Sequence, residues 1–181
     1  MIIVVTGRIG SGKDTVLNLL NIPNTYKIID ADKLGHEVLE KKSVIEKIAV
    51  QFPSAIIAGV VDRKILAKLV FPNNIKKLNC IVHPEMRAIL EKLSGKVVIN
   101  AALLDELKLA KLADKVIFVD KSERRIYEHL KNKFYKKDIK KRLKAQHKIM
   151  WYRKRADIIV KNNGSLEDLK KEIATKCQSL F

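Results

Sequence analysis

Residues 7–13 read Gly7-Arg8-Ile9-Gly10-Ser11-Gly12-Lys13, and they follow directly on an apolar run from Ile2 to Val5. A buried strand that enters a glycine-rich turn ending in lysine matches the phosphate-binding P-loop. Residues 14–20 carry their apolar side chains on one helical face, so they predict the helix that a P-loop opens. Glycines let backbone N–H groups converge on phosphate oxygens, and Lys13 adds a mobile positive charge for the β- and γ-phosphates. The sequence therefore predicts an ATP-binding loop.

Residue 14 departs from the usual pattern. The residue after the P-loop lysine is normally Ser or Thr, whose hydroxyl binds Mg²⁺, but here it is Asp14. A carboxylate is also a hard oxygen ligand, so Asp14 is the candidate Mg²⁺ ligand, directly or through water. Thr15 keeps a hydroxyl for the α-phosphate side, and the predicted ATP-binding residues of the loop are Gly10, Ser11, Gly12, Lys13, Asp14 and Thr15. Since serine would restore the usual hydroxyl, Asp14→Ser is expected to be tolerated.

The length and composition indicate a globular protein. The chain has 181 residues, 47% of them hydrophobic, which is within the range of a single domain with one sizeable core. No apolar run approaches the roughly 20 residues that a membrane span needs, and the chain begins with a core strand in place of a signal peptide. We therefore expect a cytoplasmic location and no membrane partner. Cys80 and Cys177 show no disulfide or metal-binding spacing and are expected to be reduced, buried thiols.

The charge balance is strongly basic. Lys and Arg total 37 against 20 Asp and Glu, a formal net charge of +17 that attracts polyanions. Nucleic acid, a nucleotide with several phosphates, and no particular target are all compatible with that charge. Aromatic residues make up only 6% of the chain and do not recur among the basic residues as base-stacking motifs do. We therefore expect a small-molecule substrate and no nucleic acid; the sequence does not predict the oligomeric state.

Five short apolar runs predict buried parallel strands, and helical patterns lie between them. The runs are residues 2–5, 26–29, 97–99, 116–119 and 158–160. This alternation is typical of a doubly wound α/β fold, a five-stranded parallel sheet flanked by helices, which binds its ligands beyond the carboxyl ends of the strands. The P-loop follows the first run, Asp30 and Asp32 the second, and Glu106 the third.

The segment between the second and third runs holds more residues than a simple crossover requires. Helices are predicted at residues 33–51 and 62–69, and from His83-Pro84 to about Leu93. We interpret residues 33–83 as a substrate-binding insert and the basic residues 122–154 as a lid. Residues 1–32, 84–121 and 155–181 then form the core of a single P-loop kinase domain. Residues 165–180 predict a terminal helix, with Ser165 and Asp168 at the spacing of a capping box.

Several further segments occur in a specific order. They include Asp30-Ala31-Asp32 followed by a histidine-containing helix, His83-Pro84, Ala102-Leu103-Leu104-Asp105-Glu106, Arg142-Leu143-Lys144-Ala145-Gln146, and residues 155–164. In this order the sequence resembles the dephospho-coenzyme A kinase family nearly from end to end. The resemblance implies ATP- and Mg²⁺-dependent phosphorylation of the ribose 3′-hydroxyl of dephospho-CoA.

Two alternative functions are compatible with the sequence. A nucleoside or nucleotide kinase of the same fold is the first, because substrate choice resides in the insert. A nucleic-acid-binding ATPase is the second and ranks lower, because only the net charge supports it.

The resemblance also implies roles for individual residues. Asp32 becomes the base that orients the attacking hydroxyl, although either Asp30 or Asp32 would also suit a helix cap. Arg142 becomes a lid residue that grips the transferring phosphate, although it stands in a basic run of the kind that usually forms a solvated face. Contacts to the acceptor substrate are expected from His36, Arg63, His83 and Glu106, and a contact to adenine from Asn162. Without the resemblance, His83 before Pro84 would be interpreted as a helix-start residue.

Overall fold

The five predicted strands are all present in the computed structural model, which describes residues 1–71, 73–146 and 149–181. They are β1 (Ile2–Thr6), β2 (Lys27–Asp30), β5 (Val97–Asn100), β6 (Lys115–Asp120) and β7 (Ile158–Lys161). They form one parallel sheet in the order β2–β5–β1–β6–β7, with β1 hydrogen-bonded between β5 and β6. The doubly wound α/β fold expected from the sequence is confirmed.

The chain folds as two compact units. Unit 1 comprises Met1–Ile29 and Ser94–Phe181 and contains the P-loop, and unit 2 comprises Asp30–Leu93. The insert predicted at residues 33–83 lies within unit 2, which continues to Leu93. Among the described residues, no helix combines the length and the apolar character that a membrane crossing requires.

In unit 1, alternate strand residues point to one face of the sheet and pack against two helices. These are α1 (Lys13–Leu19) and α9 (Leu166–Cys177). The buried cluster includes Ile3 and Val5 of β1 and Val16 of α1, together with Ile173 and Cys177 of α9. As the sequence predicts, Ser165 and Asp168 form a reciprocal capping box at the start of α9. The packing fixes β1 and α1 on either side of the P-loop.

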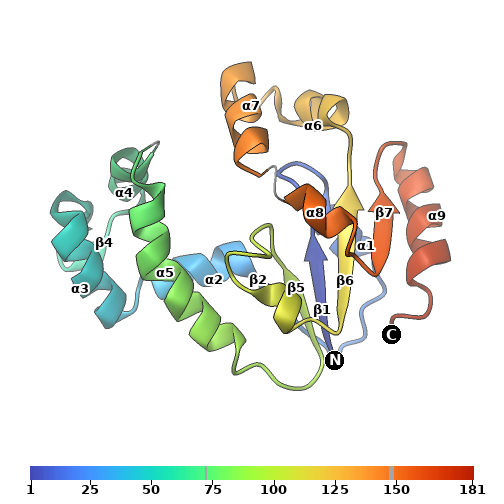
Figure 1. Cartoon of the computed structure of the whole chain (residues 1–181), viewed down its shortest axis with the longest axis horizontal. Helices are drawn as coiled ribbons and strands as arrows, with labels where there is room; N and C mark the ends of the chain where they lie inside the picture. Colours follow the sequence, from blue (N-terminus) through green and yellow to red (C-terminus); the bar gives the residue numbers. More distant parts are fainter. Residues whose placement is uncertain (72, 147–148) are drawn as a thin grey trace. The chain divides into compact units, whose positions relative to one another are not determined.

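The predicted lid region contains three short helices of unit 1, α6 (Glu123–Leu130), α7 (Lys136–Ala145) and α8 (Ile149–Arg153). A short 3₁₀ turn, η2 (Leu109–Lys111), precedes β6. Figure 1 shows α6 and α7 beyond the tips of the β1 and β6 arrows, at the carboxyl ends of these strands. Buried Ile126, Leu130 and Ile139 hold α6 and α7 together, and Ile9 of the P-loop packs against them. Helices α6 and α7 of the predicted lid region therefore pack against the P-loop.

Unit 2 has a small core of its own, formed mainly by four helices: α2 (Ala31–Val38), α3 (Lys42–Gln51), α4 (Arg63–Val70) and α5 (Ile75–Leu90). The single helix predicted over residues 33–51 is wrong, because the chain turns between α2 and α3. Val38 and Val44, both buried, are six residues apart. At about 100° per residue this spacing would place them on different sides of one continuous helix, so the turn is needed to bury both.

Two other features of unit 2 differ from the sequence-based expectation. Helix α5 begins at Ile75, not at His83, and contains Pro84 in its interior. Proline leaves the carbonyl of the fourth preceding residue, Cys80, without its helical donor, and Cys80 is exposed, so water can supply one. The expected burial of the Cys80 thiol is therefore also wrong, whereas Cys177 is buried.

A hairpin was not predicted. It follows a 3₁₀ turn, η1 (Pro53–Ala55), and consists of β3 (Ile56–Ile57) and β4 (Val60–Val61). Ala58 and Gly59, between the two apolar pairs, have φ angles of 49° and 80°. Two consecutive positive φ angles are what a two-residue hairpin turn of the primed type requires, and Gly59 was the available signal, because Ala is rare at such a position.

Candidate active site

The P-loop has the conformation that its glycines permit. Gly10 and Gly12 have φ angles of 69° and 91°, in the left-handed region that other residues rarely adopt. A Cβ atom on Gly10 would lie 3.0 Å from the Leu130 side chain, and one on Gly12 would overlap the side-chain amide of Asn162. Both positions therefore require glycine for backbone conformation and for space.

A pocket of about 540 Å³ opens above the loop, within unit 1. It is lined by five of the predicted ATP-binding residues of the loop, Gly10, Gly12, Lys13, Asp14 and Thr15, and by Asn162. Residues from the end of β6 to the turn after α6 also line the pocket: Lys121, His129, Lys133 and Phe134. A concave site of this size with converging cationic groups suits a nucleotide polyphosphate.

The lysines of the pocket are arranged around the loop. Lys13 Nζ lies 3.3 Å from the carbonyl oxygen of Gly7 and 3.4 Å from that of Arg8. Burial, and secondly the nearby Arg125 charge, lowers the pKa of Lys121 below its ordinary value. A lysine that is desolvated beside a like charge gains stability when an anion arrives. Lys121 follows β6 directly, and sequence reasoning missed it, although its position after a strand end was the available signal.

Asn162 is held by the P-loop. Its Nδ2 donates a hydrogen bond of 2.7 Å to the carbonyl oxygen of Ser11. This contact joins the residue after β7 to the middle of the loop, so Asn162 stabilises the conformation of the loop. The expected contact to adenine stays a prediction.

The predicted metal ligand also has a partner. Asn100, the last residue of β5, donates from Nδ2 to Asp14 Oδ1 at 2.7 Å. Asn100 is buried, whereas Asp14 is exposed in the first turn of α1. Sequence reasoning missed Asn100, although it directly follows the strand predicted at residues 97–99. No cluster of three or more His, Cys, Asp or Glu side chains suited to a metal ion occurs among the described residues.

Three buried side-chain oxygens of the described residues have no hydrogen-bond partner: Thr6 Oγ1, Ser11 Oγ and Asn100 Oδ1. Thr6 is the last residue of β1, immediately before the P-loop, and Ser11 belongs to the loop. Asn100 is on the strand paired with β1, where its neighbour in register is Val5. Since buried polar atoms are nearly always satisfied, their occurrence in this part of unit 1 is typical of a ligand-binding site.

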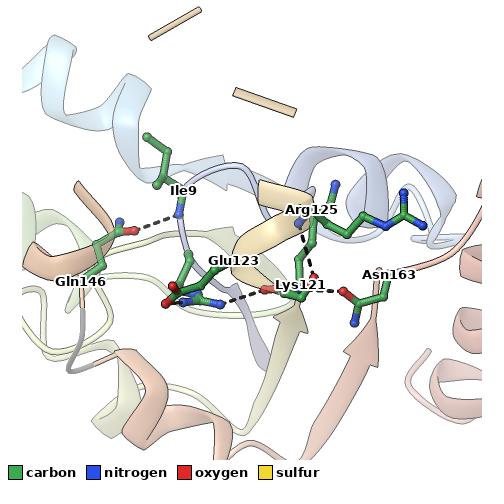
Figure 2. Close-up of polar contacts among 8 residues, drawn as sticks. Ile9, Lys121, Glu123, Arg125, Gln146 and Asn163 are labelled. Atoms are coloured by element: carbon green, nitrogen blue, oxygen red, sulfur yellow. Dashed lines mark hydrogen bonds and ion pairs between the residues drawn. The ribbon is translucent and has the colours of Figure 1, made fainter. Parts of the chain in front are cut away.

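A second set of contacts joins the P-loop to residues of the predicted lid region and to the residue before it, as Figure 2 shows. The buried Arg8 side chain donates to Glu123 Oε1 at 2.8 Å and to the carbonyl oxygen of Lys121 at 2.9 Å. Gln146 Oε1 accepts a hydrogen bond of 2.8 Å from the backbone nitrogen of Ile9. These contacts were not predicted, because nothing near Arg8 in the sequence indicates partners more than a hundred residues away.

Two predicted residues of unit 1 are less enclosed. Arg142, exposed on α7, stacks its guanidinium 4.6 Å from the centroid of the Phe134 ring, and Phe134 lines the pocket. Arg142 therefore contacts a residue that lines the pocket. Its own contact with phosphate stays a prediction. Glu106 is exposed in the loop after β5.

In unit 2, the aspartate pair is divided between two tasks. Asp30 Oδ1 accepts hydrogen bonds from the backbone nitrogens of Asp32 at 2.8 Å and Lys33 at 3.1 Å, so Asp30 is the N-cap of α2. Asp32 lies in the first turn, exposed. His36, also exposed, follows four residues later on the same face of the helix. The helix-cap interpretation therefore applies to Asp30, and Asp32 and His36 share one accessible face.

The other two predicted substrate contacts of unit 2 differ in burial. Arg63 is exposed at the first position of α4, after the N-cap Asp62. His83 is buried in the interior of α5, so its interpretation as a helix-start residue is wrong. Burial, and secondly the Arg87 charge, lowers the pKa of His83 below its ordinary value. His83 is therefore neutral near pH 7 and offers a hydrogen bond, not a positive charge.

Comparison with known proteins gives consistent results. The family model of dephospho-CoA kinase matches residues 1–168. The dephospho-CoA kinases of Fusobacterium nucleatum and Borreliella burgdorferi are 36% and 37% identical to the chain, which they match over 99% and 100% of its length and 98% and 95% of their own.

Among solved structures, the dephospho-CoA kinase from Campylobacter jejuni superposes with a TM-score of 0.69 at 29% identity, covering 99% of this chain and 96% of its own. Shikimate kinase from Aquifex aeolicus superposes with a TM-score of 0.57 at 20% identity, covering 99% of this chain and 98% of its own, which shows a shared fold.

Proposed function

The chain belongs to the dephospho-CoA kinase family, and from this premise we propose that it transfers the γ-phosphoryl group of ATP to the ribose 3′-hydroxyl of dephospho-CoA. The products are CoA and ADP, so the reaction completes the synthesis of coenzyme A. The proposal includes a cytoplasmic location, a small-molecule substrate and no nucleic-acid partner. The observation that carries it is the P-loop pocket of unit 1 in a chain whose whole length matches this family.

The donor side of the reaction is proposed to rest on unit 1. Phosphoryl transfer asks a protein mainly to position its reactants and to neutralise charge. Lys13 serves the β- and γ-phosphates, and the backbone of residues 10–15 cradles the polyphosphate chain. Asn162 keeps the loop in shape through Ser11 and borders the adenine. Arg142 reaches the transferring phosphoryl group, where a planar guanidinium can bind two phosphate oxygens at once.

The acceptor side is proposed to rest on Asp32. Its carboxylate accepts or orients the proton of the 3′-hydroxyl as the oxygen attacks phosphorus. The hydrogen bonds of Asp30 to the start of α2 support this assignment, because they leave the cap to Asp30 and the accessible carboxylate to Asp32.

Four residues are proposed to contact dephospho-CoA. His36 shares the accessible face of α2 with Asp32, and Arg63 supplies a cation for the substrate's phosphates. His83, being neutral, supplies a hydrogen bond. Glu106 follows β5 at the edge where ligands bind in this class of fold.

Mg²⁺ is proposed as the metal, with Asp14 as its protein ligand. When bound, the ion would neutralise the developing charge on the β- and γ-phosphoryl oxygens. An accessible carboxylate beside a buried amide oxygen that lacks a donor is a suitable donor set for a hard cation. Asp14 therefore holds the position that a hydroxyl has in most P-loops.

The test is ADP release in a coupled assay with ATP, Mg²⁺ and one acceptor at a time. We expect turnover with dephospho-CoA that greatly exceeds turnover with AMP or with nucleosides. Preference for AMP or a nucleoside would support a nucleotide or nucleoside kinase of the same fold instead. ATP hydrolysis that needs nucleic acid and falls steeply as salt rises would reject both.

A further inference from the structure

The contact between Asn100 and Asp14 has chemical features that a purely structural hydrogen bond does not need. Asn100 ends β5, is 8% exposed, and donates from Nδ2 to Asp14 Oδ1 at 2.7 Å. Its other polar atom, Oδ1, is buried and accepts no hydrogen bond from any residue that the structure describes. An acceptor left in this state costs about 1–3 kcal/mol, so its presence in a folded protein calls for a partner outside the chain.

The chemistry of the pair identifies that partner. Asp14 occupies the P-loop position whose side chain normally meets Mg²⁺, and its carboxylate is exposed on the pocket. Carboxylate and amide oxygens are both ligands that Mg²⁺ and Mn²⁺ accept, and the amide adds no charge. We propose that Asn100 and Asp14 together hold the nucleotide-bound divalent cation. Asn100 acts through Oδ1 on the ion or on one of its waters, and through Nδ2 on the orientation of Asp14.

The proposal rests on the proposed kinase function, because it concerns the cation that accompanies ATP. It changes one expectation from the sequence. Serine at position 14 was expected to be tolerated, but Asp14→Ser removes the only carboxylate of the pair and the acceptor of Asn100 Nδ2. We now expect Asp14→Ser to weaken cation binding, and the companion change Asn100→Asp to restore it by returning one carboxylate to the pair.

The charge of the pair predicts how each variant should change cation binding. Asp14 and Asn100 carry one negative charge between them, and the double variant Asp14→Ser/Asn100→Asp carries the same charge on the other side chain. Asn100→Asp alone places two carboxylates at hydrogen-bonding distance, which favours a bound cation and disfavours its absence. The single and double variants therefore form a cycle whose coupling is measurable.

The experiment measures the binding of the non-hydrolysable analogue AMP-PNP by calorimetry, with Mn²⁺ and again with EDTA, in the absence of any acceptor. Thermal melts of all variants establish that they are folded. The quantity of interest is the factor by which Mn²⁺ strengthens AMP-PNP binding. Electron paramagnetic resonance of free Mn²⁺ measures the same affinity from the side of the metal.

We expect Asp14→Ser and Asn100→Leu each to reduce the Mn²⁺ effect by about tenfold to a hundredfold, as for other residues that position metal ligands, without a comparable loss of binding in EDTA. Asn100→Asp should increase the effect, and the double variant should regain most of what Asp14→Ser loses. Asn162→Leu is the matched control: it also removes an amide contact to the P-loop, but it should weaken AMP-PNP equally with Mn²⁺ and with EDTA.

Three outcomes would overturn the proposal: a Mn²⁺ effect in Asn100→Leu equal to that of the parent, a double variant no better than Asp14→Ser, or a loss in EDTA as large as the loss with Mn²⁺. The last would mean that Asn100 only shapes the loop or holds a water. Failure of the parent to bind AMP-PNP under any condition would instead refute the proposed function.

Discussion

The nucleotide pocket of unit 1 and the candidate acceptor residues of unit 2 differ in how their side chains are held. In unit 1, Arg8 and Asn100 are buried and hydrogen-bonded, and Asn162 is bonded to the loop itself. In unit 2, Asp32 and His36 are exposed on the face of a short helix. The candidate donor site is therefore organised by the folding of unit 1, whereas we expect the candidate acceptor residues to depend on the substrate for their final arrangement.

This difference predicts what each kind of variant should do. Changes in the pocket of unit 1 should lower both nucleotide affinity and the free energy of unfolding. The exception is a residue that contacts only the phosphates, whose loss should leave the stability of the fold unaltered. Changes on the exposed face of unit 2 should affect the reaction and leave the fold unaltered.

The largest effect is expected from Lys13→Ala. Because we propose that this lysine serves the phosphates, its loss should abolish measurable turnover while the thermal melt stays close to that of the parent. Lys170→Ala, a change of the same kind at an exposed lysine of α9, is the control and should leave turnover unaltered. Near-parental turnover in a folded Lys13→Ala variant would remove the P-loop from the mechanism.

Asp32→Asn tests the acceptor side. A general base contributes about a hundredfold to ten-thousandfold, so kcat should fall by that order with little change in KM for either substrate. The fold should be intact, because the cap of α2 is Asp30.

Asp30→Asn is the control for that variant, because asparagine caps a helix about as well as aspartate does. It should keep both its stability and its kcat. If Asp30→Asn alone is inactive, the base is two residues earlier than we propose; if both variants turn over like the parent, neither aspartate is the base.

Arg8→Met tests whether the donor side is organised by folding. It removes two charge-assisted hydrogen bonds, one of them to the exposed Glu123, and should lower the free energy of unfolding by about 1–2 kcal/mol. The measurement is urea denaturation. Arg124→Met is the control. It removes an exposed ion pair with Glu128 on α6, the helix that also carries Glu123, and should lower the free energy of unfolding by less than about 0.5 kcal/mol. Equal losses would show that the contacts of Arg8 are no stronger than surface pairs.

The smallest effect concerns His83 and pH. Its pKa is lowered by burial and by Arg87, so the unfolded chain binds a proton below about pH 6.5 that the folded chain resists. The contribution of neutral His83 to stability is therefore complete above pH 6.5 and is lost as the pH falls. The free energy of unfolding should decrease more steeply from pH 7 to pH 5 in the parent than in His83→Gln. Parallel profiles would contradict the burial of a neutral imidazole.

The sequence by itself determined the features whose causes lie within a few residues. The P-loop was predictable from its glycines and lysine, the five strands from their apolar runs, and the start of α9 from the Ser165 capping box. Each of these signals is local, because backbone conformation, helix capping and periodicity depend on neighbouring side chains. The aspartate pair at the end of β2 was equally visible, but its division into a cap and an accessible carboxylate was not.

Only the tertiary structure decided which distant residues meet. Asn100 reaches Asp14 across 86 residues and Arg8 reaches Glu123 across 115, because the sheet order sets β5 and β6 on either side of β1. The start of α5 at Ile75 and the burial of His83 likewise come from packing, which overrode the local preference of proline for a first turn. Local patterns fix which elements form, and the burial of their apolar faces against one another fixes which polar side chains lie in contact.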